Sequence, residues 1–212
     1  MRTAFGYTKR MSYWEHRKPV RRARAVDVQD IARAAVTLLD DGGLRALTAR
    51  AVATRLDVAP ASLYSRVESV DDLFDLALDE ALGNDPTIRQ AIAHAPLLEL
   101  MHAYYRHLTD HRWACQVVGM RAPRGPNYLR LSERMVILLQ QAGAEDPLGA
   151  AYALSNFTIG SASTAPTVVS ERVMAVDIDT APTYARLHVA HGVDNEAIFT
   201  KGIAALLEYV TK

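Results

Sequence analysis

Apolar residues recur along most of the chain at spacings of three and four, whereas the alternation typical of strands is almost absent. This pattern predicts α-helices. The first expected helix starts at Asp27, a capping residue, and ends at Gly42-Gly43, where glycine tolerates the left-handed backbone of a helix end. One face of this helix is apolar and is expected to be buried: Ile31, Ala34, Ala35, Leu38 and Leu39.

Three further helices are expected before residue 84. Thr48 opens a short second helix, and Pro60 fits the first turn of a third over residues 61–66, because proline lacks only a donor that is unpaired there anyway. A fourth helix is expected over residues 70–82. The sequence GNDP at 83–86 then ends this part of the chain, which predicts a domain boundary there.

The remainder also has the pattern of helices, separated by proline and glycine. Residues 163–180 lack a clear period and predict a loop. The expected helices cover residues 97–110, 127–142, 147–161, 183–191 and 195–210. The sequence therefore predicts an all-α protein.

Composition places the chain among folded proteins without a membrane span. Half of the 212 residues are hydrophobic, which suffices for a core and excludes disorder throughout. No apolar run approaches the ~18 residues of a membrane helix, and the basic first 30 residues lack the apolar stretch of a secretory signal. The single cysteine, Cys115, excludes an internal disulfide and a Cys-rich zinc site. A soluble, cytoplasmic protein is expected.

The formal net charge of zero hides a strong asymmetry. Residues 1–26 carry eight Lys or Arg and one Glu, a net charge of +7. Residues 27–83 carry five Arg and eleven Asp or Glu, a net charge of −6. A basic N-terminal arm is suited to nucleic-acid phosphates, because neutralising phosphates releases counterions. A solvated tail is the alternative.

Residues 48–65, TARAVATRLDVAPASLYS, have the make-up of a helix-turn-helix. With its surroundings, this segment carries a wider pattern: Gly43, Leu47-Thr48, Arg50, Val52-Ala53, Leu56, Val58, Leu63-Tyr64 and Leu73. On these residues, the stretch 31–82 resembles the N-terminal DNA-binding domain of the tetracycline-repressor (TetR) family of bacterial transcriptional regulators. The resemblance implies that the helix starting at Pro60 enters the major groove of operator DNA.

The residue types indicate how this motif would bind DNA. Thr48, at a helix start, can offer its hydroxyl and nearby backbone N–H groups to a phosphate. The first turn of the recognition helix approaches base edges; its residues are Pro60, Ala61 and Ser62. The resemblance implies phosphate contacts for Tyr64 and Ser65, with Tyr64 also closing the small core, and a backbone or base contact for Arg50.

The chain departs from the family pattern at two places. It has Arg66-Val67 where the family usually has His-Phe after the tyrosine, and Val70 where the family often has a phosphate-binding lysine. Arg66 or the basic arm could compensate, and Arg22 and Arg24 lie where an arm could enter the minor groove. The alternative is that Arg50, Tyr64 and Arg66 merely cover a surface.

Residues 125–160 and 194–210 are similar to the regulatory domain of the TetR-like branch. The resemblance implies that the last long helices of two subunits form a four-helix bundle, and a two-fold dimer matches a palindromic operator. Small residues would allow close helix approach: Gly149, Ala150, Ala153 and Gly160. The expected partner face consists of Ile198, Phe199, Gly202, Ile203 and Leu206. The alternative is that these faces form monomer core.

An effector pocket is expected in the larger half, with an apolar and aromatic lining and a few polar groups. The candidate residues are His102, Tyr105, Trp113, Met120, Asn127, Met135, Asn156, Phe157 and Met174. These types favour a hydrophobic or aromatic effector. The Ala- and Arg-rich, Lys-poor composition is typical of GC-rich bacteria, which favours an antibiotic-like compound.

Rival functions have less support. The pairs His107/His111 and His188/His191 have spacings that can bind a metal, but no Cys cluster or HExxH pattern accompanies them. Cys115 near His111 is a conceivable nucleophile and base, without any catalytic motif beside it. A ligand-sequestering helical protein without DNA-regulatory activity is a further alternative. No metal and no cofactor are expected.

The sequence thus predicts a basic arm at 1–26, a helix-turn-helix DNA-binding domain at 27–84, and a ligand-binding and dimerisation domain at 85–212. The predicted function is that of a homodimeric repressor which a small effector releases from a palindromic operator. The helix at 70–82 would carry the coupling between the two domains.

Overall fold

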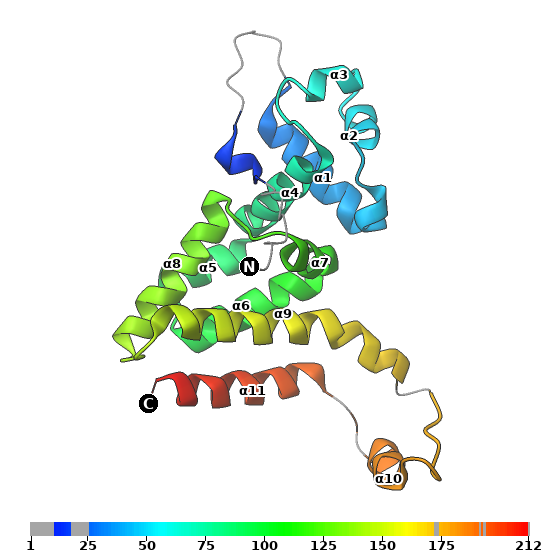
Figure 1. Cartoon of the computed structure of the whole chain (residues 1–212), viewed down its shortest axis with the longest axis vertical. Coiled ribbons are helices and arrows are strands. Elements are labelled where there is room, and N and C mark those ends of the chain that lie inside the picture. The colour runs from blue at the N-terminus through cyan, green and yellow to red at the C-terminus, as the bar shows by residue number, and fades with distance from the viewer. Residues whose placement is uncertain (1–10, 18–25, 172–173, 191, 193, 212) are drawn as a thin grey trace, which may run out of the picture.

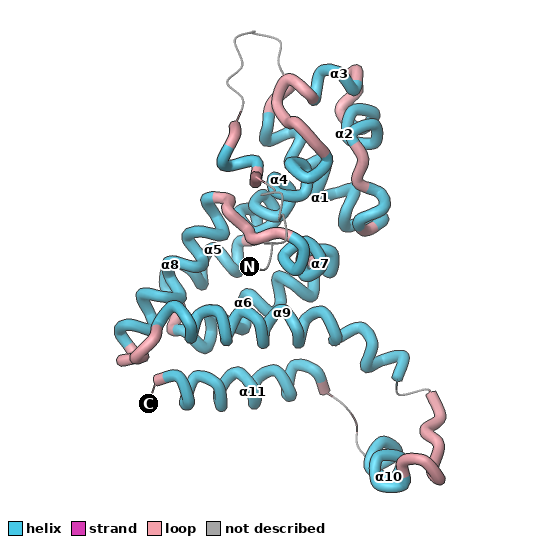
Figure 2. The backbone as a smooth tube through the Cα atoms, viewed as in Figure 1, coloured by secondary structure: helices cyan, strands magenta, loops and turns pink. Residues whose placement is uncertain are grey.

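The computed structural model describes residues 11–17, 26–171, 174–190, 192 and 194–211. These residues form helices and connecting loops without a strand (Figures 1 and 2). The all-α prediction is confirmed. None of the described helices is both long and apolar enough to cross a membrane.

The N-terminal half is built around two long helices that pack against each other, α1 (Val28–Gly42) and α4 (Val70–Asn84). Asp27 caps α1 by accepting a hydrogen bond from the Gln29 amide at 2.9 Å, and Gly43 ends it with φ +66°. Two short helices, α2 (Ala49–Arg55) and α3 (Pro60–Leu63), lie beyond α1 at one end of the molecule (Figure 1). Short 3-10 turns complete this half: η1 (Tyr13–Glu15) and η2 (Leu44–Ala46).

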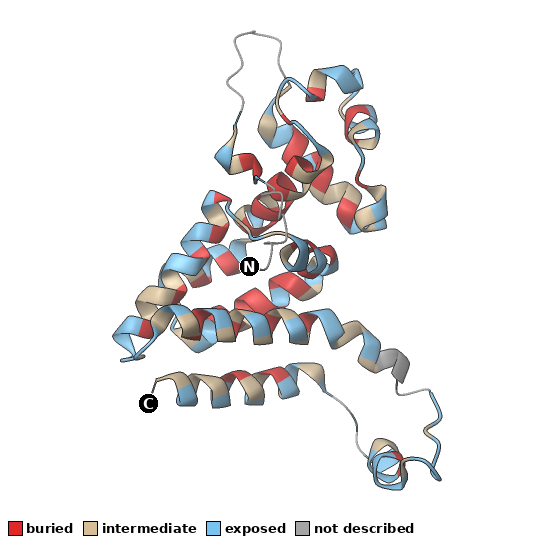
Figure 3. Ribbon diagram, in the orientation of Figure 1, coloured by how far each residue is buried: buried red, intermediate tan, exposed pale blue. Residues whose placement is uncertain are grey.

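The C-terminal half is organised around α6 (Leu97–Asp110), which packs against α9 (Pro147–Glu171) and against α5 (Pro86–His94). Helix α11 (Asn195–Val210) runs beside α9 and also contacts α6. The remaining helices are α7 (Arg112–Met120), α8 (Pro126–Gln141) and α10 (Pro182–Ala190). The buried residues line the facing sides of α1, α4 and α6, whereas α10 lies away from the body (Figures 1 and 3).

Most expected helices are confirmed, and those over 97–110 and 195–210 have the predicted bounds. Two helices are absent from the prediction. Helix α5 buries only Ile88 and Ala91, so its sequence has no apolar face that repeats at the helical spacing. Helix α7 begins directly after His111, which ends α6, and no proline or glycine separates the two.

The prediction of a loop over residues 163–180 is wrong in its first part, because α9 continues to Glu171. No residue from 147 to 170 is charged, and the helix accommodates Pro166. The hydroxyls of Thr164 and Thr167 donate to backbone carbonyls one turn back, at 2.9 and 2.8 Å. A helix with small residues on most sides has little apolar period, so the pattern alone does not reveal it.

Candidate nucleic-acid interface and ligand groove

Local hydrogen bonds build the helix-turn-helix at α2 and α3. The Thr48 hydroxyl accepts from the Ala51 amide at 3.0 Å, which caps α2 as expected. At the turn, Asp57 adopts φ +53° and the Val58 amide donates to the Ala53 carbonyl at 3.0 Å. Aspartate tolerates this left-handed backbone better than most residues. Pro60 then starts α3.

The DNA-contact candidates gather on the outer surface of α2 and α3. Val52, Ala53 and Leu63 are buried and hold the two helices against the core. The exposed candidates are Thr48, Arg50, Pro60, Ala61, Tyr64 and Ser65, and Ser62 is half-buried. The sequence-predicted set therefore forms one solvent-facing surface, which we call the α2–α3 surface.

Two candidates differ from expectation. Tyr64 is 47% exposed, so the expectation that it closes the small core is wrong; Leu63 and Val67 do so. The Arg66 guanidinium donates to the Val26 carbonyl at 2.9 Å, which ties the end of α3 to the chain just before α1. Arg22 and Arg24 lie outside the described residues, as does most of the predicted arm.

Three aspartates of the N-terminal half are buried on α4 and are not exposed to solvent. Asp72, Asp75 and Asp79 on α4 are at most 5% exposed. Asp79 accepts from the Asn127 amide at 2.8 Å and the Tyr128 amide at 3.1 Å, so a carboxylate of α4 caps the N-terminus of α8. Burial raises the pKa of Asp79, although the hydrogen bonds from Tyr128 and Asn127 oppose this shift.

A second buried pair links α4 to the end of α7. The Arg121 guanidinium binds both oxygens of Asp75 at 2.9 Å and the Asp71 carboxylate at 2.7 Å. The hydrogen bond to Asp75 is the main cause of a raised Arg121 pKa. These acidic positions recur at spacings of three and four on α4. This spacing, which places the carboxylates on one face of the helix, is the one feature of the sequence that could have predicted that they act together.

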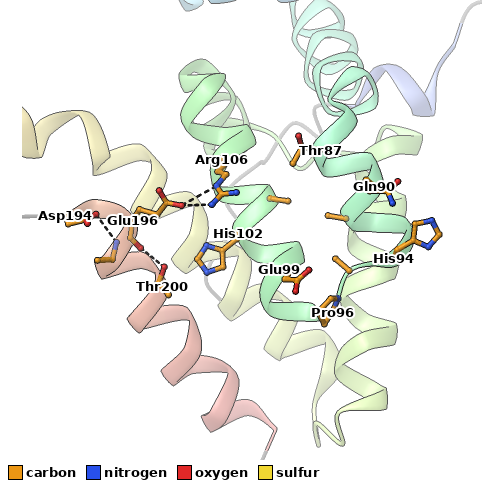
Figure 4. A pocket seen from close by; sticks show the side chains of 14 residues that line it. Thr87, Gln90, His94, Pro96, Glu99, His102, Arg106, Asp194, Glu196 and Thr200 are labelled. Carbon is orange, nitrogen blue, oxygen red and sulfur yellow. Dashed lines mark hydrogen bonds and ion pairs between the residues drawn. The ribbon is translucent and has the colours of Figure 1, made fainter.

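A groove of about 780 Å³ lies between α5, α6 and α11. Figure 4 shows Gln90 and His94 on one side and Glu196 on the other, with the side chains of α6 between them. Arg106 and Glu196 form an ion pair at 2.8 Å across it. The further polar lining comes from Thr87, Glu99, His102, Asp194 and Thr200.

An aromatic cluster lies beside this groove. Phe199 of α11 is fully buried and stacks on Tyr105 of α6, with ring centroids 4.2 Å apart. Phe157 of α9 also stacks on the Phe199 ring, with centroids 5.8 Å apart. His102, which lines the groove, meets the Phe199 ring edge-on at a centroid distance of 5.2 Å. Three sequence-predicted ligand residues, His102, Tyr105 and Phe157, therefore converge on Phe199.

The other ligand candidates do not converge there. Met120, Asn156 and Met174 are exposed at separate places. Asn127 donates to the buried Asp79, and the Trp113 indole donates to Asp40 of α1 at 2.7 Å, so both side chains lie at the junction of the two halves. Met135 is buried between α8 and α9, where the Ser155 hydroxyl contacts its sulfur at 3.8 Å. Sequence reasoning missed Glu99 and Arg106, which share the polar face of α6 with His102.

The rival sites have an ordinary structural environment. His107 is fully buried and its ring Nδ1 lies 3.1 Å from Asp85, while His111 pairs with Asp40. Burial lowers the pKa of His107, although the hydrogen bond with Asp85 opposes this shift. Burial also raises the pKa of the Cys115 thiol to about 11, which disfavours the thiolate needed by a nucleophile. The described residues contain no group of three metal-ligating side chains, and His191 lies outside them.

Comparisons with known proteins match both halves. The family described as "Bacterial regulatory proteins, tetR family" matches residues 24–77, and "Tetracyclin repressor-like, C-terminal domain" matches residues 93–208. An HTH-type transcriptional regulator of Saccharopolyspora erythraea is 37% identical over 158 residues, which are 71% of this chain and 66% of that protein. The HTH-type transcriptional repressor DrrR1 of Streptomyces coeruleorubidus is 29% identical over 143 residues, 62% of this chain and 51% of that protein. The chain thus spans about two thirds and about half of the lengths of these two relatives.

Among solved structures, the TetR family protein ActR of Streptomyces coelicolor in complex with actinorhodin superposes with a TM-score of 0.69. It is 23% identical, and the match covers 89% of this chain and 96% of ActR. At that identity the likeness establishes the fold.

Proposed function

This chain belongs to the tetracycline-repressor (TetR) family of bacterial DNA-binding transcriptional regulators, and on that premise we propose that it is a homodimeric repressor released from a palindromic operator by a small aromatic effector. The members of this family are regulators, not enzymes.

The α2–α3 surface is the observation that carries the DNA-binding part. It presents Thr48 and the first turn of α3 to solvent on a firmly packed core. A recognition helix reads bases through its N-terminal residues. Pro60 and Ala61 can pack on thymine methyl groups, and Ser62 can hydrogen-bond either way. Arg50, Tyr64 and Ser65 then bind the flanking phosphates.

Exposed apolar side chains on the outer faces of α9 and α11 support the proposed homodimer. The outer side of α9 exposes Leu148, Tyr152, Asn156 and Gly160. Residues 147–170 of this helix include no charged residue. Ile198 and Tyr209 of α11 are 55% and 81% exposed. An apolar face of this extent indicates a protein partner, and the two-fold symmetry of half-sites makes a second copy the fitting one.

The structure corrects which residues can face that partner. Phe199 and Ile203, expected on the partner face, are fully buried within the protomer. Gly202 serves close packing inside the protomer, because a Cβ at this position would lie 2.2 Å from the Phe157 ring. The proposed interface therefore uses Leu148, Tyr152, Ile198 and Tyr209.

The groove over Phe199 is the proposed effector site. Its lining includes the His102 ring, which the buried Phe199 ring meets edge-on, and a half-buried ring of this kind suits an aromatic ligand, because stacked and edge-on ring pairs are favourable. Its walls carry Glu99 and the Arg106–Glu196 ion pair, which suit hydroxyl or charged substituents. ActR, a neighbour in fold, was solved with actinorhodin, which supports a small-molecule ligand for this chain.

Helix α4 is the proposed route of coupling. Asp79 caps α8, and Asp75 holds Arg121 at the end of α7, so two elements of the C-terminal half bind α4 through buried charges. A ligand that moves these elements also turns α4 and the α2–α3 surface. Linkage then requires that effector and operator weaken each other's binding by the same factor.

Selection of bound sequences from a random DNA pool, with wild type and Tyr64→Ala in parallel, tests the proposal. Wild type should enrich a palindrome with half-sites about one helical turn apart, ~34 Å, or somewhat more if the subunits splay. Enrichment of no sequence by a folded dimer would favour a ligand-sequestering protein instead. Candidate aromatic compounds are then added to the selected complex, and release of the DNA identifies an effector.

A further inference from the structure

Residues 11–17, which we call the clasp, fold against α4 ahead of the helix-turn-helix. Tyr13 is 3% exposed and Ser12 is 6% exposed. The Tyr13 amide donates to the Asp75 carboxylate at 2.8 Å, and the Trp14 ring meets the Tyr13 ring edge-on at 5.1 Å. The clasp precedes the segment 24–77 that matches the family's DNA-binding domain. A buried anchor in this place is unexpected for a solvated arm.

Three parts of the chain meet at Asp75. Its Oδ2 atom accepts from both the Tyr13 amide and the Arg121 guanidinium, and its Oδ1 atom accepts a second Arg121 N–H at 2.9 Å. The same guanidinium donates to the Met11 carbonyl at 3.3 Å. The Arg121 side chain is 7% exposed. One buried cation of the C-terminal half thus binds α4 and the clasp together.

The other end of the clasp reaches the start of α4. His16 Nε2 lies 3.2 Å from Asp72 and 3.6 Å from Glu68. Asp72 also accepts from the Glu68 and Ser69 amides, at 2.6 and 3.3 Å, in the connection between α3 and α4. The clasp therefore spans from Arg121 to the loop that follows the recognition helix.

We propose that the clasp is a regulatory strap. It docks on α4 only while the Arg121 guanidinium binds the Asp75 carboxylate, and once docked it holds α4 in one orientation relative to α7. Asp75 without Arg121 would be a buried carboxylate lacking its counter-charge, an arrangement that folded proteins avoid. The site must then admit water, which competes with the Tyr13 amide for Asp75, and the Met11 carbonyl loses its Arg121 donor. A movement of the C-terminal half that withdraws Arg121 therefore also releases the clasp.

Fluorine NMR of protein labelled with 5-fluorotryptophan tests the docking. The chain has two tryptophans, and Trp113→Phe assigns the remaining signal to Trp14. Tyr13→Ala supplies the position of the undocked signal. Arg121→Met should move the Trp14 signal to that position, whereas the matched control Arg124→Met, an exposed charge in the same loop, should leave it in place. A folded Arg121→Met protein with the wild-type Trp14 signal would overturn the proposal.

A second variant covers the case in which Arg121→Met does not fold. Arg121→Lys keeps the charge but loses the two-pronged contact with Asp75. It should populate both Trp14 signals, with the docked one reduced by at least half. A folded Arg121→Lys protein with Trp14 fully docked would refute the dependence on this ion pair.

The link to DNA rests on the proposed function and has its own experiment. The probe is the palindrome selected from random DNA. Tyr13→Ala should change operator affinity by at least about fivefold, the lower end of typical coupling, and the operator should change the ratio of docked to undocked Trp14 signal of wild type by the same factor. Unchanged affinity, or changed affinity without a Trp14 response, would refute the coupling. If no sequence is selected at all, the proposed function fails, while the fluorine spectra still decide the docking.

Discussion

Removal of the carboxylate of Asp79 should destabilise the protein more than removal of any exposed helix cap. In Asp79→Ala, the Asn127 and Tyr128 amides at the start of α8 lose their acceptor in a site where Asp79 is 4% exposed. An unpaired buried donor costs about 1–3 kcal/mol and a lost N-cap about 0.5–2 kcal/mol, and these effects overlap. We expect the free energy of unfolding to fall by about 2–4 kcal/mol.

The matched control is Asp146→Ala, since Asp146 accepts from the Gly149 amide at 2.9 Å but is exposed. This change should cost about 0.5–1 kcal/mol. Thermal unfolding should then give a melting temperature roughly 5–15 °C lower for Asp79→Ala and only a few degrees lower for the control. Equal losses for the two variants would refute the claim that burial of the cap sets its importance.

Two further measurements separate the contribution of the capping hydrogen bonds to stability from that of the carboxylate charge. Asp79→Asn keeps one acceptor oxygen for the two amides, so it should lose roughly half as much stability as Asp79→Ala. The pKa of Asp79 is raised by burial, so its contribution is complete below the ordinary value of 3.8 and declines as the pH rises through the raised pKa. The cost of Asp79→Asn should accordingly be smaller at pH 7 than at pH 4. A cost that grows with pH would show that the hydrogen bonds outweigh desolvation.

Three other predictions address the remaining parts of the molecule. Tyr64→Ala should weaken operator binding at least about tenfold by fluorescence anisotropy, whereas Tyr184→Ala, at similar exposure on α10, should leave it unchanged; equal effects would exclude the α2–α3 surface. Tyr152→Arg places a charge on the outer face of α9 and should give monomers in analytical ultracentrifugation, while Met120→Arg, also at an exposed apolar site, should not; a dimer in both would exclude this interface. Burial alone would lower the pKa of His16, but the Asp72 hydrogen bond and the charges of Asp72 and Glu68 raise it overall. His16→Gln should therefore lower the free energy of unfolding by its full amount below pH 6.5, and this loss should vanish as the pH rises through the raised pKa; a loss that does not vary with pH would contradict this.

Features whose causes lie within a few residues could be predicted from the sequence. Asp27 and Thr48 cap α1 and α2 as expected, and Pro60 starts α3, because capping and proline geometry act between neighbours. Strong apolar periods located α6 and α11 with their correct bounds. The helix-turn-helix and the family resemblance rest on such local features. The DNA-contact roles and the domain bounds stay predictions.

Only the tertiary structure decided what the buried charges do. In the sequence, the aspartates of α4 are polar positions on a helix, and such positions are ordinarily solvent-exposed. The hydrogen bonds of Asp75 and Asp79 join them to Arg121 and Asn127, 46 and 48 residues away. A carboxylate becomes stable inside a protein only when a distant chain segment brings a counter-charge or amide donors to it. The sequence contains both partners but has no local signal for their meeting, so the junction between the two halves had to be seen in three dimensions.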